Sequence, residues 1–273
     1  MSKLILFLLL PLLLNGLAWL ANMDYLISVN FVLGGVTLAL LGNAWKVLTR
    51  NEWKIFLGIC GISNVITVLI EVIMLRLDSW GFTAQRFHLL GLTFLGAPIE
   101  EYNFWIYAPV LVCLAYLVLS HERDLSSPGF GEIFLSVLAA RKLQVLEEDI
   151  SKRIISKIVY IEDSVDGKYF AGSKIPTYVT IQLLLLATIL WLRRYYHGSR
   201  QALALTTAVF FLTMMPYEQY AIRSGFWTYN AHRMLGIFFL DVPLEGWCMY
   251  FLPPVAGGMI IDVLSQRFFK KDI

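Results

Sequence analysis

The stretch EVIMLRLDSW at residues 71–80 returns as EQYAIRSGFW at residues 218–227. Both have the pattern Glu-x4-Arg-x3-Trp, and they lie 147 residues apart. Further matches follow at an offset of 145 residues; they pair Gly91, Pro98, Glu100 and Pro109 with Gly236, Pro243, Glu245 and Pro254. Agreement at seven positions with nearly one offset predicts that the chain contains two copies of one structural unit.

The composition is typical of a membrane protein. Of the 273 residues, 58% are hydrophobic and 15% are charged, whereas soluble domains have roughly 45–50% apolar and about 25% charged residues. The net charge of +2 is small, and no basic cluster is interleaved with aromatic residues, which argues against nucleic-acid binding.

Seven apolar segments are about long enough to cross a bilayer. They lie near residues 4–21, 25–45, 55–75, 98–119, 178–193, 201–221 and 243–264. The first segment resembles a signal peptide, but no small-residue cleavage site follows it, so we expect a retained helix. The sequence therefore predicts an all-α, polytopic membrane protein with about seven transmembrane helices.

The apolar segments divide the chain into three parts. We expect a first membrane unit at residues 1–120, a polar linker at 121–177 and a second membrane unit at 178–273. Apolar spacing at roughly residues 133–159 predicts an amphipathic helix within the linker. Each copy holds three spans, and an odd number predicts that the second copy is inverted relative to the first.

The basic residues do not show which end of this inverted arrangement faces the cytoplasm. They lie in two corresponding loops, and inversion would place these loops on opposite faces of the membrane. One loop carries Lys46, Arg50 and Lys54, and the other carries Arg193, Arg194 and Arg200.

Glutamates at membrane depth are the first candidates for function, because ionisable groups there are costly. Glu100 and Glu101 follow Pro98, and Glu245 follows Pro243. A carboxylate just after a proline can simply cap a helix start. Beside apolar spans, the alternative is a catalytic acid, because burial favours the neutral carboxyl group that can donate a proton.

Glu71 and Glu218 form a second class, each followed five residues later by an arginine, Arg76 or Arg223. They can form ion pairs that hold helices together, or they can support the catalytic carboxyls by setting the local charge. The arginines can instead mark the membrane boundary, with the side chain extending to water.

Aromatic residues crowd the same segments. Such residues often form belts at the membrane interface, but they can also line a pocket whose ring faces stabilise a cation. The candidates for such a substrate pocket are Trp80, Phe82, Phe104, Trp105, Trp227, Tyr229 and Trp247.

The sequence lacks the motifs of metal-binding, retinal-binding and phosphate-binding proteins. The three cysteines form no CxxC pair and the four histidines have no metal-ligand spacing, so we expect no metal site. The predicted spans have no interior lysine for a retinal Schiff base, and no Gly-rich phosphate loop is present.

Two segments resemble the lycopene cyclase domain family, small membrane enzymes with tandem repeats that each carry a proline-x-glutamate-acid motif. One segment runs from Trp80-Gly81-Phe82 to Pro98-Ile99-Glu100-Glu101, and the other from Trp227-Thr228-Tyr229 to Pro243-Leu244-Glu245. The second motif ends in Gly246, where the family usually has another acid.

The resemblance implies a carotenoid cyclase, an isomerase that closes the end of lycopene or a similar polyene into a β-type ring. Protonation starts this redox-neutral reaction, so no cofactor is needed. Glu100 or Glu101 would donate the proton, and Glu245 would act as base or stabilise the cation. The alternatives are a cyclase for another isoprenoid, a carotenoid hydratase, or a non-catalytic carotenoid- or lipid-binding protein.

The resemblance also implies a place for the protein in the cell. We expect an integral protein of a prokaryotic cytoplasmic membrane, with membrane lipid and a hydrophobic polyene as its partners. A homo-oligomer, or association with other carotenoid enzymes, is compatible with the family.

Overall fold

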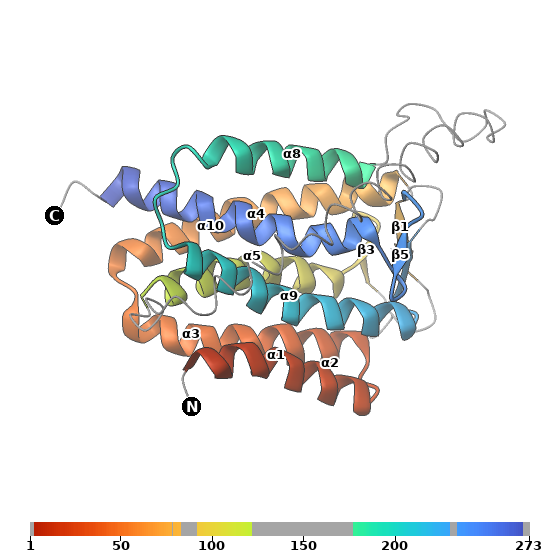
Figure 1. Cartoon of the computed structure of the whole chain (residues 1–273). Helices are drawn as coiled ribbons and strands as arrows, with labels where there is room; N and C mark the ends of the chain where they lie inside the picture. Colours follow the sequence, from red (N-terminus) through yellow and green to blue (C-terminus); the bar gives the residue numbers. More distant parts are fainter. Residues whose placement is uncertain (1–2, 78, 83–91, 122–176, 230–233, 270–273) are drawn as a thin grey trace, which may run out of the picture.

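The computed structural model describes residues 3–77, 79–82, 92–121, 177–229 and 234–269. The predicted amphipathic helix of the linker lies outside these residues. Helices make up most of the described part, and their axes are roughly aligned, with the chain running both ways along them (Figure 1). They are α1 (Lys3–Leu20), a continuous rod of α2 (Tyr25–Val29), η1 (Asn30–Gly34) and α3 (Gly35–Val47), then α4 (Arg50–Arg76), α5 (Glu101–Ser120), α8 (Thr177–Leu192), α9 (Arg200–Arg223) and α10 (Leu244–Phe269).

These helices coincide with all seven predicted apolar segments. By length and composition, four can span a membrane: the α2–η1–α3 rod, α4, α5 and α10. Helices α1 and α8 are apolar but shorter. Helix α9 has 24 residues but carries Thr206, Thr207, Thr213 and Glu218, all buried. Because other helices surround α9, it does not need an apolar surface facing lipid.

Short strands gather at one end of the bundle (Figure 1). Strands β1 (Trp80–Phe82) and β4 (Trp227–Tyr229) pair with each other in antiparallel fashion. Two hairpins complete this end: β2 (Thr93–Phe94) with β3 (Ala97–Pro98), and β5 (Phe238–Phe239) with β6 (Val242–Pro243). Pro98 and Pro243 each end a strand, and the helices that follow begin at Glu101 and Leu244, slightly after the predicted starts of these two apolar segments.

The duplication extends to individual hydrogen bonds. The amide of Ile99 donates to the carbonyl of Leu92 over 3.0 Å, and in the second copy Leu244 donates to Ile237 over 2.8 Å. Each hairpin turn has two residues with positive φ, as the two central residues of a type I′ turn require. These residues are Leu95 and Gly96 in the first copy, and Leu240 and Asp241 in the second.

The two copies run in the same direction, so the predicted inverted repeat does not fit this structure. Strand β1 begins four residues after α4 ends, and β4 begins four residues after α9 ends. Because β1 pairs with β4, α4 and α9 end at the same end of the bundle. The copies are therefore parallel repeats around an axis along the helices, an arrangement also known in transporters.

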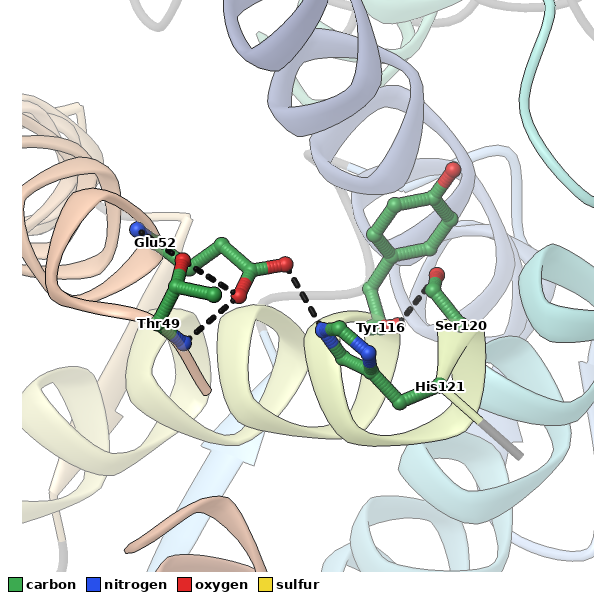
Figure 2. A network of polar contacts seen from close by, with 5 residues as sticks. All are labelled: Thr49, Glu52, Tyr116, Ser120 and His121. Atoms are coloured by element: carbon green, nitrogen blue, oxygen red, sulfur yellow. Dashed lines mark hydrogen bonds and ion pairs between the residues drawn. The ribbon is translucent and has the colours of Figure 1, made fainter. Parts of the chain in front are cut away.

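The prediction of an inverted second copy was wrong because it assumed that α5 ends and the second copy begins on the same side of the membrane. Helix α5 ends at Ser120, and Nε2 of the next residue, His121, lies 2.7 Å from Oε1 of Glu52 at the start of α4 (Figure 2). Glu52 also accepts hydrogen bonds from the amide and hydroxyl of Thr49 in a capping box. Helix α8 starts at the opposite end, where the ring of Tyr178 lies 6.1 Å from that of Tyr229.

Parallel repeats bring both basic loops to the end of the bundle opposite the strands. Their side chains are exposed, and they are those of Lys46, Arg50, Lys54, Arg193, Arg194 and Arg200. Two aromatic pairs lie at the same end, Trp45 with Trp53 and Trp191 with Tyr195. Basic residues in short loops favour the cytoplasmic side, and aromatic residues mark a membrane interface, so we expect this end to face the cytoplasm.

Cysteine labelling tests the parallel arrangement. In a variant without the native cysteines Cys60, Cys113 and Cys248, we expect Lys46→Cys and Arg194→Cys to react with a membrane-impermeant maleimide only in inside-out vesicles.

The exposed Leu92, beside the hairpin of the first copy, provides the control. Leu92→Cys should react only in right-side-out vesicles. Labelling of Lys46→Cys and Arg194→Cys from opposite sides would restore the inverted arrangement.

Candidate functional site

A cavity of about 320 Å³ lies inside the bundle and reaches its strand end. Its walls come from both copies: α4, β1 and α5 of the first, and α8, α9, β4 and α10 of the second. Most lining side chains are apolar, but two carboxyl groups, Glu101 and Glu218, also line it. The fold thus brings one glutamate from each copy to a shared apolar space.

Glu101 lies in the first turn of α5 and is buried. The hydroxyl of Tyr25 donates a hydrogen bond to its Oε2 atom. Tyr25 is the first residue of α2 and is itself fully buried, with its ring 5.8 Å from that of Trp227. This contact fixes the carboxyl group of Glu101 from a separate helix.

Glu218, near the end of α9, accepts three hydrogen bonds. Its Oε1 accepts from Trp227 Nε1 at 3.0 Å and from the Tyr229 hydroxyl at 2.5 Å, and its Oε2 accepts from the Tyr250 hydroxyl at 2.5 Å. Burial, followed by the charge of Glu218, raises the pKa of Tyr229 well above its usual value. Tyr229 therefore keeps its proton and acts as a donor to Glu218.

The other predicted glutamates are buried but are not among the described residues that line the cavity. Glu100 precedes α5 without making a capping hydrogen bond to it. Oε1 of Glu245 accepts from the amide of Leu235, and its backbone carbonyl accepts from Gln182 of α8 over 2.6 Å. Glu71 is buried in α4. The sequence motifs did not distinguish the glutamates within each class. The face of the helix on which a glutamate lies decides whether it reaches the cavity.

The predicted arginines lie away from the cavity. Arg76 is exposed at the end of α4. Arg223 is also exposed; its Nε donates to Asp241 Oδ2 over 3.0 Å, and its guanidinium lies 5.5 Å from the ring centre of Trp19. Thus Arg223 connects α9 to the β5–β6 turn and to α1.

Most of the predicted aromatic residues surround the two carboxyl groups. The lining includes Phe82, Phe104, Trp105, Trp227 and Tyr229, together with Tyr178, Phe210 and Tyr250. Their ring faces can stabilise positive charge on a bound molecule. The side chain of Trp80 lies outside what the structure describes.

Trp247 has a different position from the one predicted. Its Nε1 donates to the carbonyl of Phe239 over 3.1 Å, and its ring packs on Phe211 and Phe239. In the first copy the hydroxyl of Tyr102 makes the corresponding bond to the carbonyl of Phe94 over 2.7 Å. Both side chains hold a hairpin against the following helix.

Gly246 lines the cavity at the position that corresponds to Glu101. A Cβ atom there would lie 2.8 Å from Cγ1 of Val242 and 3.5 Å from the hydroxyl of Tyr229. A side chain at this position would require Val242 to move, so the packing around the second copy fits glycine.

Two tyrosines of this site were missed in the sequence. Tyr25 is the first residue of α2 and Tyr178 the second residue of α8, the first helices of the two copies, and both are buried beside the strands. Nothing in the local pattern distinguishes them from interfacial aromatic residues, and only their shared place in the duplication could have drawn attention to them. Within the described residues, no three His, Cys, Asp or Glu side chains are grouped to hold a metal ion.

Comparison with protein families gives one clear match. A family model described as lycopene cyclase matches residues 22–119 and 173–264, which together make up well over half of the chain. Searches of curated proteins and of solved structures gave no match.

The three donors to Glu218 give a prediction about stability. Glu218→Ala would leave three buried donors without this acceptor, and each such loss costs about 1–3 kcal/mol. We therefore expect a strong drop in the thermal unfolding temperature in detergent. Glu218→Gln should cost less, because its amide oxygen can still accept.

Asp241→Asn is the control, because the Arg223–Asp241 pair is exposed and such pairs contribute only about 0–1 kcal/mol. If Glu218→Ala and Asp241→Asn lowered the unfolding temperature equally, the three hydrogen bonds to Glu218 would not contribute to stability as expected.

Proposed function

The chain belongs to the lycopene cyclase family, and we propose that it closes the linear end of a carotenoid such as lycopene into a β-type ring. The observation that carries this proposal is the cavity, where Glu101 and Glu218 face a space lined mainly by apolar and aromatic side chains. Such a space suits a polyene, and a carboxyl group within it can supply the proton that starts ring closure.

We assign the proton donor to Glu101. Of the Glu100–Glu101 pair, it is the residue that lines the cavity, and the hydrogen bond from Tyr25 holds one oxygen. A general acid must reach the atom that it protonates. Neither Glu100 nor Glu245 is among the described lining residues, so we assign both to the support of the site.

The proposed reaction balances without a redox partner. Glu101 gives its proton to a carbon of the terminal double bond, which forms a C–H bond and a tertiary cation. A nearby double bond attacks that cation and closes the ring with a new C–C bond. A ring carbon then loses a proton to the Glu101 carboxylate, which restores the acid.

Glu218 and the aromatic rings would stabilise the cation while it exists. A carboxylate held by three donors is fixed in place, and fixed charges stabilise developing charge without reorganisation. The rings of Phe104, Trp105 and Trp227 line the same space and add favourable cation–π interactions. We further propose that the protein works in a prokaryotic cytoplasmic membrane, where a lipid-soluble polyene would be available to it.

Expression in a lycopene-accumulating bacterium tests the proposal. We expect the protein to convert lycopene to a cyclic product of the same mass, detected by chromatography and mass spectrometry. Glu101→Gln should lower the conversion by roughly 10²–10⁴-fold, the usual contribution of a general acid. Glu245→Gln should cost much less.

Glu52→Gln is the matched control, because Glu52 is at the far end of the bundle in the capping box of α4. Full activity of Glu101→Gln would remove Glu101 as the donor. A product heavier by one water would indicate a hydratase, and bound but unchanged polyene would indicate a binding protein.

A further inference from the structure

The described helices cover the two sides of the bundle unequally. Of the described helices, α1 alone falls outside the two copies. It packs against α9, η1 and α3; Nδ2 of Asn15 donates to the carbonyl of Thr213 in α9 over 3.1 Å. On the α3 side the contact is close, because a Cβ atom at Gly35 would lie 2.8 Å from Cδ1 of Leu14. Thus α1 closes the side of the bundle between α3 and α9.

The repeat relates this closed side to the side between α8 and α4, because α3 corresponds to α8 and α9 to α4. Figure 1 shows α8 and α1 on opposite sides of the bundle. Within the described residues, no helix covers α4 and α8 as α1 covers their counterparts. The cavity lies on this uncovered side, and its wall includes Ser63 and Thr67 of α4 and Ile181 and Leu185 of α8.

The cavity is long and follows the helices. Its lining runs along α5 from Glu101 to Cys113 and along α10 from Gly246 to Ile260. At the usual helical rise, these stretches measure about 18 Å and about 21 Å. Both carboxyl groups are near the strand end, because Glu101 opens α5 and Glu218 contacts Trp227 of β4. The rest of the cavity is lined mainly by apolar side chains. We call this long cavity, with the two carboxyl groups at its strand end, the groove.

We propose that the polyene enters this groove sideways from the lipid bilayer, between α4 and α8, with one chain end against Glu101 and Glu218. The rest of the chain then lies along α5 and α10 in the direction of the basic end. The α1 side is closed and Gly246 replaces the second acid, so the protein has one reactive centre and cyclises one end of a molecule at a time. This inference rests on the proposed cyclase function for the identity of the bound chain.

Tryptophan substitutions test the route. Thr67→Trp on α4 and Leu185→Trp on α8 place a bulky ring in the groove. Matched controls are Leu69→Trp and Leu184→Trp, since both residues are on the same two helices but exposed on the outer surface. We expect the groove variants to lose conversion on the order of 10²-fold, as misplaced substrates do, and the outer variants to keep it.

A second measurement separates this inference from the function itself. The amount of polyene that copurifies with Glu101→Gln should fall when Thr67→Trp or Leu185→Trp is added, and should not fall with Leu69→Trp or Leu184→Trp. If the parent protein shows no cyclisation but this pattern of binding holds, the function is wrong and the route stands. If the parent protein cyclises and all four tryptophan variants behave alike in both measurements, the route is wrong.

Discussion

The pairing of β1 with β4 is the contact on which the arrangement of the two copies depends. The two strands occupy equivalent places in the two copies, and Gly81 is opposite its own counterpart, Thr228, at the centre of the pair. An antiparallel pair of equivalent strands has a local two-fold axis, and here the preceding helices α4 and α9 both end at the strand end of the bundle, so they run in the same direction. The same axis places α5 and α10 against helices of the opposite copy. Because helices of the two copies pack against each other in this way, the cavity is lined by both copies.

Within this symmetric frame, the chain builds an unsymmetric site. Glu101 has Gly246 as its counterpart, and among the described helices α1 covers one side of the bundle without an equivalent on the other. The donors differ as well, because Tyr229 and Tyr250 contact Glu218 through hydroxyl groups, whereas Phe82 and Trp105 occupy the matching places in the first copy. A duplicated unit offers two possible centres, and in the proposed reaction only the centre that contains Glu101 has the acid.

Buried carboxyl groups are costly in an apolar interior unless they are hydrogen-bonded. The chain meets this cost with aromatic side chains that serve two purposes. Trp227, Tyr229 and Tyr250 donate to Glu218 through their polar atoms and also line the cavity with their rings. Tyr25 holds Glu101 in the same manner from α2. Stability and the shape of the site are therefore set by the same few residues.

The sequence by itself determined the helices, the duplication and the set of buried acids. Hydropathy over about 20 residues located the helices that the structure describes, because lipid requires long apolar segments with satisfied backbones. The repeated Glu, Arg, Trp and Pro positions showed the two copies. The tertiary structure decided the rest. The direction of the second copy depends on where α5 ends and α8 begins, which local patterns do not encode. Glu101, rather than Glu100 or Glu245, reaches the cavity because neighbouring residues on a helix point about 100° apart, and only packing decides which face turns inward. Tyr25 joins Glu101 across 76 residues of sequence, a contact that exists only once the helices have packed.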